Sequence, residues 1–260
     1  MLSKNKIKFI NTLKKKKHRN EKGLFIAEGT KVVTELLNQG MEATLVCATA
    51  PWLASHPVSD PANAIEQIET TDKELHKISS LTTPQEVLAL FRMPEEGIDR
   101  QTLSGNLSLV VDRINDPGNL GTIVRIADWF GIPNVLCSTD TVDVYNPKTV
   151  QSTMGSISRV SVAYRELGEV LKEAAGWSGF NIYGCFLEGE SLYQAPLGES
   201  GLIVMGSESH GISQNLLPYI NRHLYIPAFP GRGATGAESL NVSVATGIVC
   251  SEFKRRQQLP

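Results

Sequence analysis

The stretch LSLVVDRINDPGNLGTIVRIADWFG, residues 107–131, contains a strand, a loop and a helix in succession. Its apolar start is typical of a strand that is buried on both faces. The glycines and the proline of NDPGNLG predict a loop, and the apolar residues that follow recur at the spacing of an amphipathic helix. A buried strand joined to a helix in this way indicates an α/β domain with a largely parallel sheet.

The same arrangement recurs twice further along the chain. The run LIVMG (202–206) leads into SESHG and a predicted helix, ISQNLLPYI (212–220), and LYIP (224–227) leads through a long loop into a predicted helix at 239–253. In open α/β sheets, ligands bind beyond the carboxyl ends of the strands. Three glycine-bearing loops after three strands therefore predict one ligand site at that edge of the sheet.

The third loop contains GRGATG (231–236), which has the glycine spacing of a dinucleotide-binding loop. Such a loop opens a βαβ unit of about thirty residues, with an acidic residue some twenty positions later to hold the ribose. Twenty positions after Gly236 stands Arg256, four residues before the sequence ends. A nicotinamide or flavin enzyme is therefore the weaker interpretation, and a loop that presents Arg232 to a phosphate is preferred.

The N-terminal part also alternates helix and strand patterns, and its charge is uneven. Residues 1–22 contain nine lysines and arginines against the single acid Glu21, although the whole chain has a net charge of −2. A basic segment favours a polyanionic partner such as a nucleic acid, because each cation near a phosphate releases a counterion; a flexible tail or solvated helix end is the alternative. The polar stretch after Met93 predicts domains at 1–94 and 107–260, joined by a linker at 95–106.

The apolar runs and the cysteines argue against a membrane, secreted, disulfide-bonded or metal-binding protein. No run of about eighteen apolar residues exists, and charges stand where a signal peptide would be apolar, so we expect a cytoplasmic protein without a membrane partner. The cysteines lack the spacing of a metal or redox motif, so we expect no disulfide and no metal. They are Cys47, Cys137, Cys185 and Cys250.

Three motifs together carry a specific resemblance. NDPGNLGTIVRIADWFG (115–131), LIVMGSESHGIS (202–213) and IPAFPGRGATGAESLNVSVATGI (226–248) resemble, in order and near the usual spacing, the motifs of the SpoU, or TrmH-like, branch of the SPOUT RNA methyltransferases. VDVYNPKTVQSTMGS (142–156) is similar to the segment between these motifs. FIAEGTKVVTELL (25–37) more loosely resembles the family's RNA substrate-binding domain, a small ribosomal-protein-like α/β fold.

The resemblance implies an α/β fold whose C-terminal parallel sheet carries a trefoil knot, an exception to the unknotted topology of most proteins. It also implies a homodimer, S-adenosylmethionine as cofactor and methylation of a ribose 2′-hydroxyl in RNA. The two-domain layout favours ribosomal RNA over transfer RNA. The alternatives are a transfer RNA methyltransferase and a non-catalytic RNA-binding or ribosome-assembly protein. The presence of every family site residue argues against the non-catalytic alternative.

Arg125 is the residue that the resemblance places in catalysis. A guanidinium is almost never deprotonated, so we expect it to bind a phosphate and stabilise the developing alkoxide rather than to act as a base. The structural alternative is a surface pair with Asp128, three residues along the same helix. Glu208 is expected to position the reacting groups, with Arg125 as its partner, and a solvated loop residue is the alternative.

Further site residues follow from the same motifs. Asn119 is expected to orient Arg125 or the ribose, and Ser239 and Asn241 to lie near the reacting ribose, whereas a helix cap is the alternative for each. The residues expected to cradle the adenosine of the cofactor are Gly206, Ile226 and Leu240. The sequence departs from the family in its extended 229–238 loop, which leaves the edge of the pocket undefined.

Overall fold

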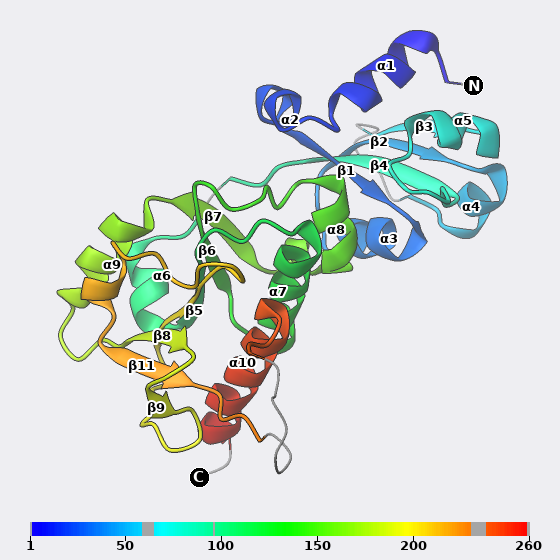
Figure 1. Cartoon of the computed structure of the whole chain (residues 1–260). Helices are drawn as coiled ribbons and strands as arrows, with labels where there is room; N and C mark the ends of the chain where they lie inside the picture. The colour runs from blue at the N-terminus through cyan, green and yellow to red at the C-terminus, as the bar shows by residue number, and fades with distance from the viewer. Residues whose placement is uncertain (1, 59–64, 96, 230–237, 259–260) are drawn as a thin grey trace. The chain divides into compact units, whose positions relative to one another are not determined.

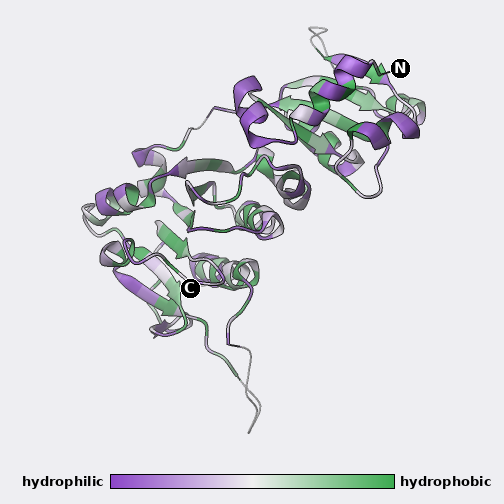
Figure 2. Ribbon diagram, turned by 45° about the horizontal axis from the view of Figure 1, so that its top comes forward, coloured by the Kyte–Doolittle hydropathy of each residue, from purple (hydrophilic) through white to green (hydrophobic). Residues whose placement is uncertain are grey.

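The chain forms two compact units (Figure 1). The residues that the computed structural model describes are 2–58, 65–95, 97–229 and 238–258. Unit 1 consists of Met1–Glu95 and Asp143–Ser158, and unit 2 of Glu96–Val142 and Arg159–Pro260. In each unit, hydrophobic residues are concentrated in the central strands (Figure 2). Within the described residues, no helix has the length and apolar character needed to cross a membrane.

Unit 1 is built on a mixed sheet of four strands in the order β1-β4-β2-β3. β4 is antiparallel to both β1 and β2, whereas β3 is parallel to β2. The strands are β1 (Leu24–Glu28), β2 (Ala43–Ala48), β3 (Glu66–Glu69) and β4 (Val87–Arg92). The helices are α1 (Lys4–Thr12), α2 (Lys16–Lys22), α3 (Thr30–Asn38), α4 (Ala50–Ser55), α5 (Asp72–Ile78) and α8 (Pro147–Thr153). The small α/β fold expected for the front of the chain is confirmed.

The basic N-terminal segment is folded into α1 and α2 rather than left as a tail. Ile10 and Leu13 are fully buried in the core of unit 1 and anchor α1. Lys14 is drawn into the fold as well, because its Nζ donates to the carbonyl of Ser79 at 2.7 Å. Six lysines of the segment remain exposed: Lys4, Lys8, Lys15, Lys16, Lys17 and Lys22.

Arg19, the arginine of this segment, forms a buried ion pair. Its guanidinium donates to Asp143 Oδ2 through Nε, at 3.1 Å, and through Nη2, and Nη1 donates to two backbone carbonyls of the preceding turn. Only 2% of the Arg19 side chain and 8% of that of Asp143 are exposed. Near Asp143, the centroid of the Tyr145 ring lies 5.0 Å from that of the Phe25 ring. Asp143–Ser158, which lies between two motifs in the sequence, is thus part of unit 1 in space.

Unit 2 is built on a sheet of seven strands in the order β7-β6-β5-β10-β8-β11-β9, and all neighbouring pairs are parallel. The strands are β5 (Leu107–Val111), β6 (Asn134–Ser138), β7 (Ser161–Arg165), β8 (Ile182–Phe186), β9 (Glu190–Ser191), β10 (Gly201–Met205) and β11 (Arg222–Tyr225). The helices are α6 (Arg100–Gly105), α7 (Pro117–Trp129), α9 (Leu167–Ala175) and α10 (Val242–Gln258). α7 and α10 pack on each other. The parallel α/β sheet expected from the sequence is confirmed.

Three segments differ from the sequence-based expectation or lie partly outside the described residues. The predicted helix at 212–220 is wrong, because the structure has only a short 3₁₀ turn, Leu217–Tyr219. Apolar residues recur every four positions in this segment, as they would in a helix. They do so because Ile212, Leu216 and Ile220 all pack in the core of unit 2. Residues 95–106, expected as a linker, contain α6. The trefoil knot stays a prediction, because residues 230–237, within the C-terminal part concerned, lie outside the described residues.

Candidate active site

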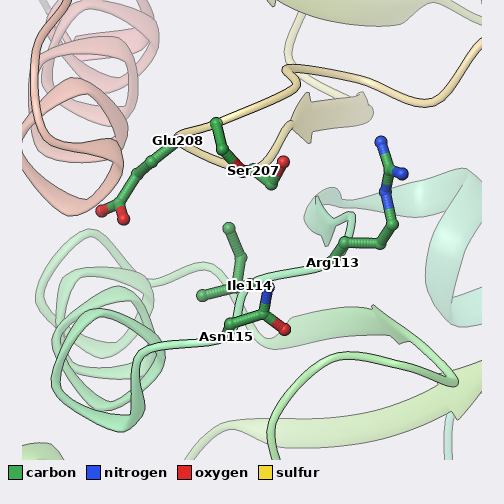
Figure 3. Close-up of a pocket in the computed structure, with 6 residues that line it drawn as sticks. Arg113, Ile114, Asn115, Ser207 and Glu208 are labelled. Atoms are coloured by element: carbon green, nitrogen blue, oxygen red, sulfur yellow. The ribbon is translucent and has the colours of Figure 1, made fainter.

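The loops after β5 and β10 meet at one edge of the sheet in unit 2. The two strands are parallel neighbours, paired up to Val111 and Met205, so their carboxyl ends lie side by side. The loops face each other across a cavity of about 90 Å³, and Glu208 turns from it toward α7 and α10 (Figure 3). The residues that line the cavity are Arg113, Ile114, Asn115, Ser207, Glu208 and Ser209.

The loop after β10 closes tightly on itself. Ser207 and Gly211 exchange backbone hydrogen bonds of 3.0 and 2.9 Å, and Gly211 has a φ of 65°, a conformation that favours glycine. A Cβ atom on Gly206 would overlap the backbone of Gly211. Gly206, a predicted site residue, therefore permits a close approach of two backbone segments that a side chain would prevent.

Asp112 joins the two loops and was not among the predicted site residues. Its backbone N–H donates to the carbonyl of Met205 at 2.9 Å, and its Oδ2 accepts from the backbone N–H of Ser213 at 2.7 Å. The side chain is only 4% exposed, so the buried carboxylate holds the two loops together. The available signal was an acid placed directly after an apolar strand.

Three predicted site residues, far apart in the sequence, form one hydrogen-bonded cluster. Asn119 Nδ2 donates to Glu208 Oε1. Asn241 Nδ2 donates to the same carboxylate oxygen at 3.2 Å and to Asn119 Oδ1 at 3.1 Å. A carboxylate, which is an acceptor only, suits these two amide donors. The cluster thus ties the start of α7, the loop after β10 and the start of α10 together.

Ser243, which was not among the predicted site residues, holds Asn241 in one orientation. Its Oγ donates to Asn241 Oδ1 at 2.6 Å, and its backbone N–H donates to the same oxygen at 2.9 Å. Because Asn241 Oδ1 faces the helix, its Nδ2 faces Glu208 and Asn119. Asn241 is therefore both the cap of α10 and a member of the cluster. α7 is capped by Asp116, whose Oδ1 accepts from the backbone N–H of Asn119 at 2.9 Å.

Arg125 and Ser239 are not brought into this cluster. Arg125 is exposed, and in the described part of the chain it makes no hydrogen bond or ion pair. Arg125 follows Asn119 by six residues, so its position on α7 is displaced from that of Asn119 by roughly 9 Å along the helix axis and about 120° around it. Asp128, its expected surface partner, forms an ion pair with Arg159 at 2.8 Å. Ser239 is exposed.

The residues assigned to the cofactor lie in different environments. Gly206 belongs to the closed loop, Ile226 is half-buried after β11, and Leu240 is 48% exposed just before α10. GRGATG, with Arg232, and almost all of the extended 229–238 loop lie outside the described residues. The assignment of these residues to the cofactor stays a prediction.

Comparison with known proteins gives consistent matches. Residues 106–251 match the SpoU rRNA Methylase family, and residues 4–89 match the MRM3-like substrate binding domain. The chain is 31% identical, over 94% of both chains, to the 23S rRNA (guanosine(2553)-2′-O)-methyltransferase RlmP of Bacillus subtilis. Its structure resembles a TrmH-family protein from Porphyromonas gingivalis, with a TM-score of 0.87, 39% identity and coverage of 98% and 99%. It also resembles an AdoMet-bound rRNA methyltransferase from Sinorhizobium meliloti, with a TM-score of 0.83, 29% identity and coverage of 100% and 97%.

Proposed function

Because the chain belongs to the SpoU rRNA methylase family, and is an S-adenosylmethionine-dependent ribosomal RNA 2′-O-methyltransferase, we propose that the cluster of Asn119, Glu208 and Asn241 is its reaction site. The family resemblance read from the sequence is confirmed. The observation that supports the site is the convergence of two amides and a carboxylate, from three separate segments, at the carboxyl edge of the sheet. This is the edge at which ligands bind in such folds.

The cluster suits a reaction that depends on alignment. Bound S-adenosylmethionine supplies a methyl group on a sulfonium, whose departing thioether is neutral. The protein then has to hold the ribose O2′ in line with the methyl group and stabilise the negative charge that develops on O2′ as its proton passes to water. Asn119 and Asn241 supply oriented amides, and Glu208 keeps both in place. Arg125, with an exposed guanidinium, is the cation available for the alkoxide and the adjoining phosphate.

In the same proposal, the cofactor binds beside this cluster. At Gly206 the loop closes so tightly that a Cβ atom would overlap the backbone of Gly211, so a ligand at this loop would meet backbone groups rather than a side chain. Ile226 and Leu240 offer apolar side chains on which an adenine ring can pack. In this assignment Gly206, Ile226 and Leu240 bind the adenosine.

Unit 1 supplies the contact with RNA in this proposal. Its match to a substrate-binding domain and the exposed lysines of α1 and α2 support residues 1–94 as the RNA-binding part. The match at 106–251 supports residues 107–260 as the methyltransferase part, from which Asp143–Ser158 pack with unit 1. Lys15, Lys16 and Lys17 stand together at the start of α2. Their charges suit the phosphates of a structured RNA.

A second copy of the chain is the partner proposed for the face formed by α7 and α10. Trp129 is 83% exposed and Val244 is 51% exposed on this face, and large exposed apolar residues in a group mark interaction surfaces. They line a hollow of about 560 Å³. Arg125 lies one helical turn before Trp129 on the same face of α7, so dimer formation would bring it near the contact.

Trp129→Glu is expected to weaken the dimer at least about tenfold, because it places a charge at an aromatic contact. Sedimentation velocity over a range of concentrations measures this, and methylation by the variant should fall with the dimer fraction. Leu187→Glu is the matched control, because Leu187 is 72% exposed but is not part of this face, and it should leave the dimer intact. A Trp129→Glu protein that remains dimeric would contradict the interface.

The function is tested by incubating the protein with methyl-labelled S-adenosylmethionine and unmodified ribosomal RNA. The label should appear at a discrete ribose, detected as one phosphodiester bond that resists alkaline hydrolysis. Transfer RNA, incubated in parallel, should take up little label. Label found on a base, or in transfer RNA alone, would refute the assignment.

A further inference from the structure

Arg113, directly after Asp112 at the end of β5, has an unusual backbone conformation. Its φ of 55° lies in the left-handed region, which disfavours residues with a side chain. Two buried hydroxyls hold the turn. Ser138 Oγ accepts from the N–H of Arg113 at 2.8 Å, and Thr141 Oγ1 accepts from the N–H of Ile114 at 3.3 Å. Strained positions that are held in this way cluster at functional sites.

The guanidinium of Arg113 lacks a hydrogen-bond acceptor among the described residues. Its Nε is buried and makes no hydrogen bond, although 35% of the side chain is exposed. Nε forms an ion pair with Asp112 Oδ1 at 3.8 Å, a separation that is too long for a hydrogen bond. The other oxygen of Asp112 is engaged by Ser213. A buried donor without a partner needs an explanation, and a bound group is one.

The cavity beside Arg113 has the size of a small oxyanion. Its volume of about 90 Å³ corresponds to roughly three water molecules, too little for a nucleobase and a ribose together. Arg113 lies at one end and Glu208 points away at the other (Figure 3). The planar fork of a guanidinium matches the paired oxygens of a phosphate or a carboxylate.

We propose that Arg113 binds an oxyanion of a reactant, either a backbone phosphate next to the target ribose or the carboxylate of S-adenosylmethionine. The inference rests on the proposed function, because both reactants meet at this edge of the sheet. Arg113 is a substrate-binding residue in this scheme and does not take part in proton transfer.

Arg113→Gly tests the proposal, because glycine adopts a φ of 55° without strain and the variant should be at least as stable as the wild type. Filter binding to an in vitro transcript of bacterial 23S ribosomal RNA, over a range of salt, should show roughly tenfold weaker affinity. The slope of log K against log salt should fall by about 0.7 to 0.9, the loss of one phosphate contact. Calorimetric titration with S-adenosylmethionine should be unchanged if a phosphate is the ligand. A tenfold loss in that titration, with RNA binding intact, would assign the carboxylate instead.

Arg100→Gln is the matched control, because Arg100 precedes β5 at the opposite edge of the sheet and contacts the ring of Trp177 at 5.2 Å. It removes the same charge and should leave both affinities and the salt slope unchanged. The proposal is overturned if Arg113→Gly matches this control in both titrations, or if its losses follow a lowered melting temperature. A wild type that fails to methylate ribosomal RNA would remove the proposed function, whereas the two binding titrations would still decide the role of Arg113.

Discussion

Replacing Arg125 with alanine is expected to lower the rate of ribose methylation by about 10²- to 10³-fold and to leave the affinity for S-adenosylmethionine nearly unchanged. The reason is electrostatic. Arg125 is exposed, is free of ion pairs to described residues, and carries a charge that can be aimed at a developing alkoxide. Its removal should therefore affect the transition state more than the bound cofactor. Single-turnover methylation and calorimetric titration with S-adenosylmethionine measure the two quantities.

Arg159→Ala is the control for the loss of one charge near α7. Arg159 forms an ion pair with Asp128 of the same helix, and its loss should change methylation only a few-fold. If Arg125→Ala keeps turnover within the range of Arg159→Ala, the assignment of Arg125 fails.

The same variant shows which protomer uses Arg125. Arg125 and Trp129 share a face of α7, whereas Asn119 lies about 120° away, so we expect Arg125 to serve the site of the partner protomer. Mixing Arg125→Ala chains with Glu208→Ala chains should then restore methylation, because one site of each mixed dimer has both residues intact. No recovery on mixing would indicate that Arg125 acts in its own protomer.

Replacing Asp143 with alanine is expected to lower the free energy of unfolding of unit 1 by about 3 to 5 kcal/mol. The substitution leaves the guanidinium of Arg19 buried, at 2% exposure, without its counter-charge. The two backbone carbonyls that Nη1 contacts cannot supply the missing charge. Hydrogen exchange read by mass spectrometry measures the loss separately in peptides of unit 1 and unit 2.

Two further variants isolate the cause. Glu42→Ala removes a carboxylate from an exposed pair with Arg92, and should cost less than about 1 kcal/mol. Combining Asp143→Ala with Arg19→Met removes both buried charges and should recover most of the stability. An Asp143→Ala protein within 1 kcal/mol of the wild type would show that the buried pair does not stabilise unit 1.

The sequence alone was enough to predict the parallel sheet and three of the residues that meet at its carboxyl edge. Apolar runs alternating with helical patterns leave few other folds, and the carboxyl ends of parallel strands share one edge. The structure accordingly joins Asn119, Glu208 and Asn241, which the motifs had selected. The motifs also predicted the family, because three ordered stretches with the same residue types seldom agree by chance.

Only the tertiary structure decided which polar side chains have hydrogen-bond or ion-pair partners. Arg19 counted among the basic residues expected to meet RNA, yet it is buried against Asp143, 124 positions away. Ser243 orients Asn241, Asp112 joins the loops after β5 and β10, and the buried Nε of Arg113 makes no hydrogen bond to the described residues. Local periodicity reports which face of an element is apolar, because that depends on residues a few positions apart. Burial, ion pairing and backbone strain depend on segments that meet only after folding, so no local pattern contained them.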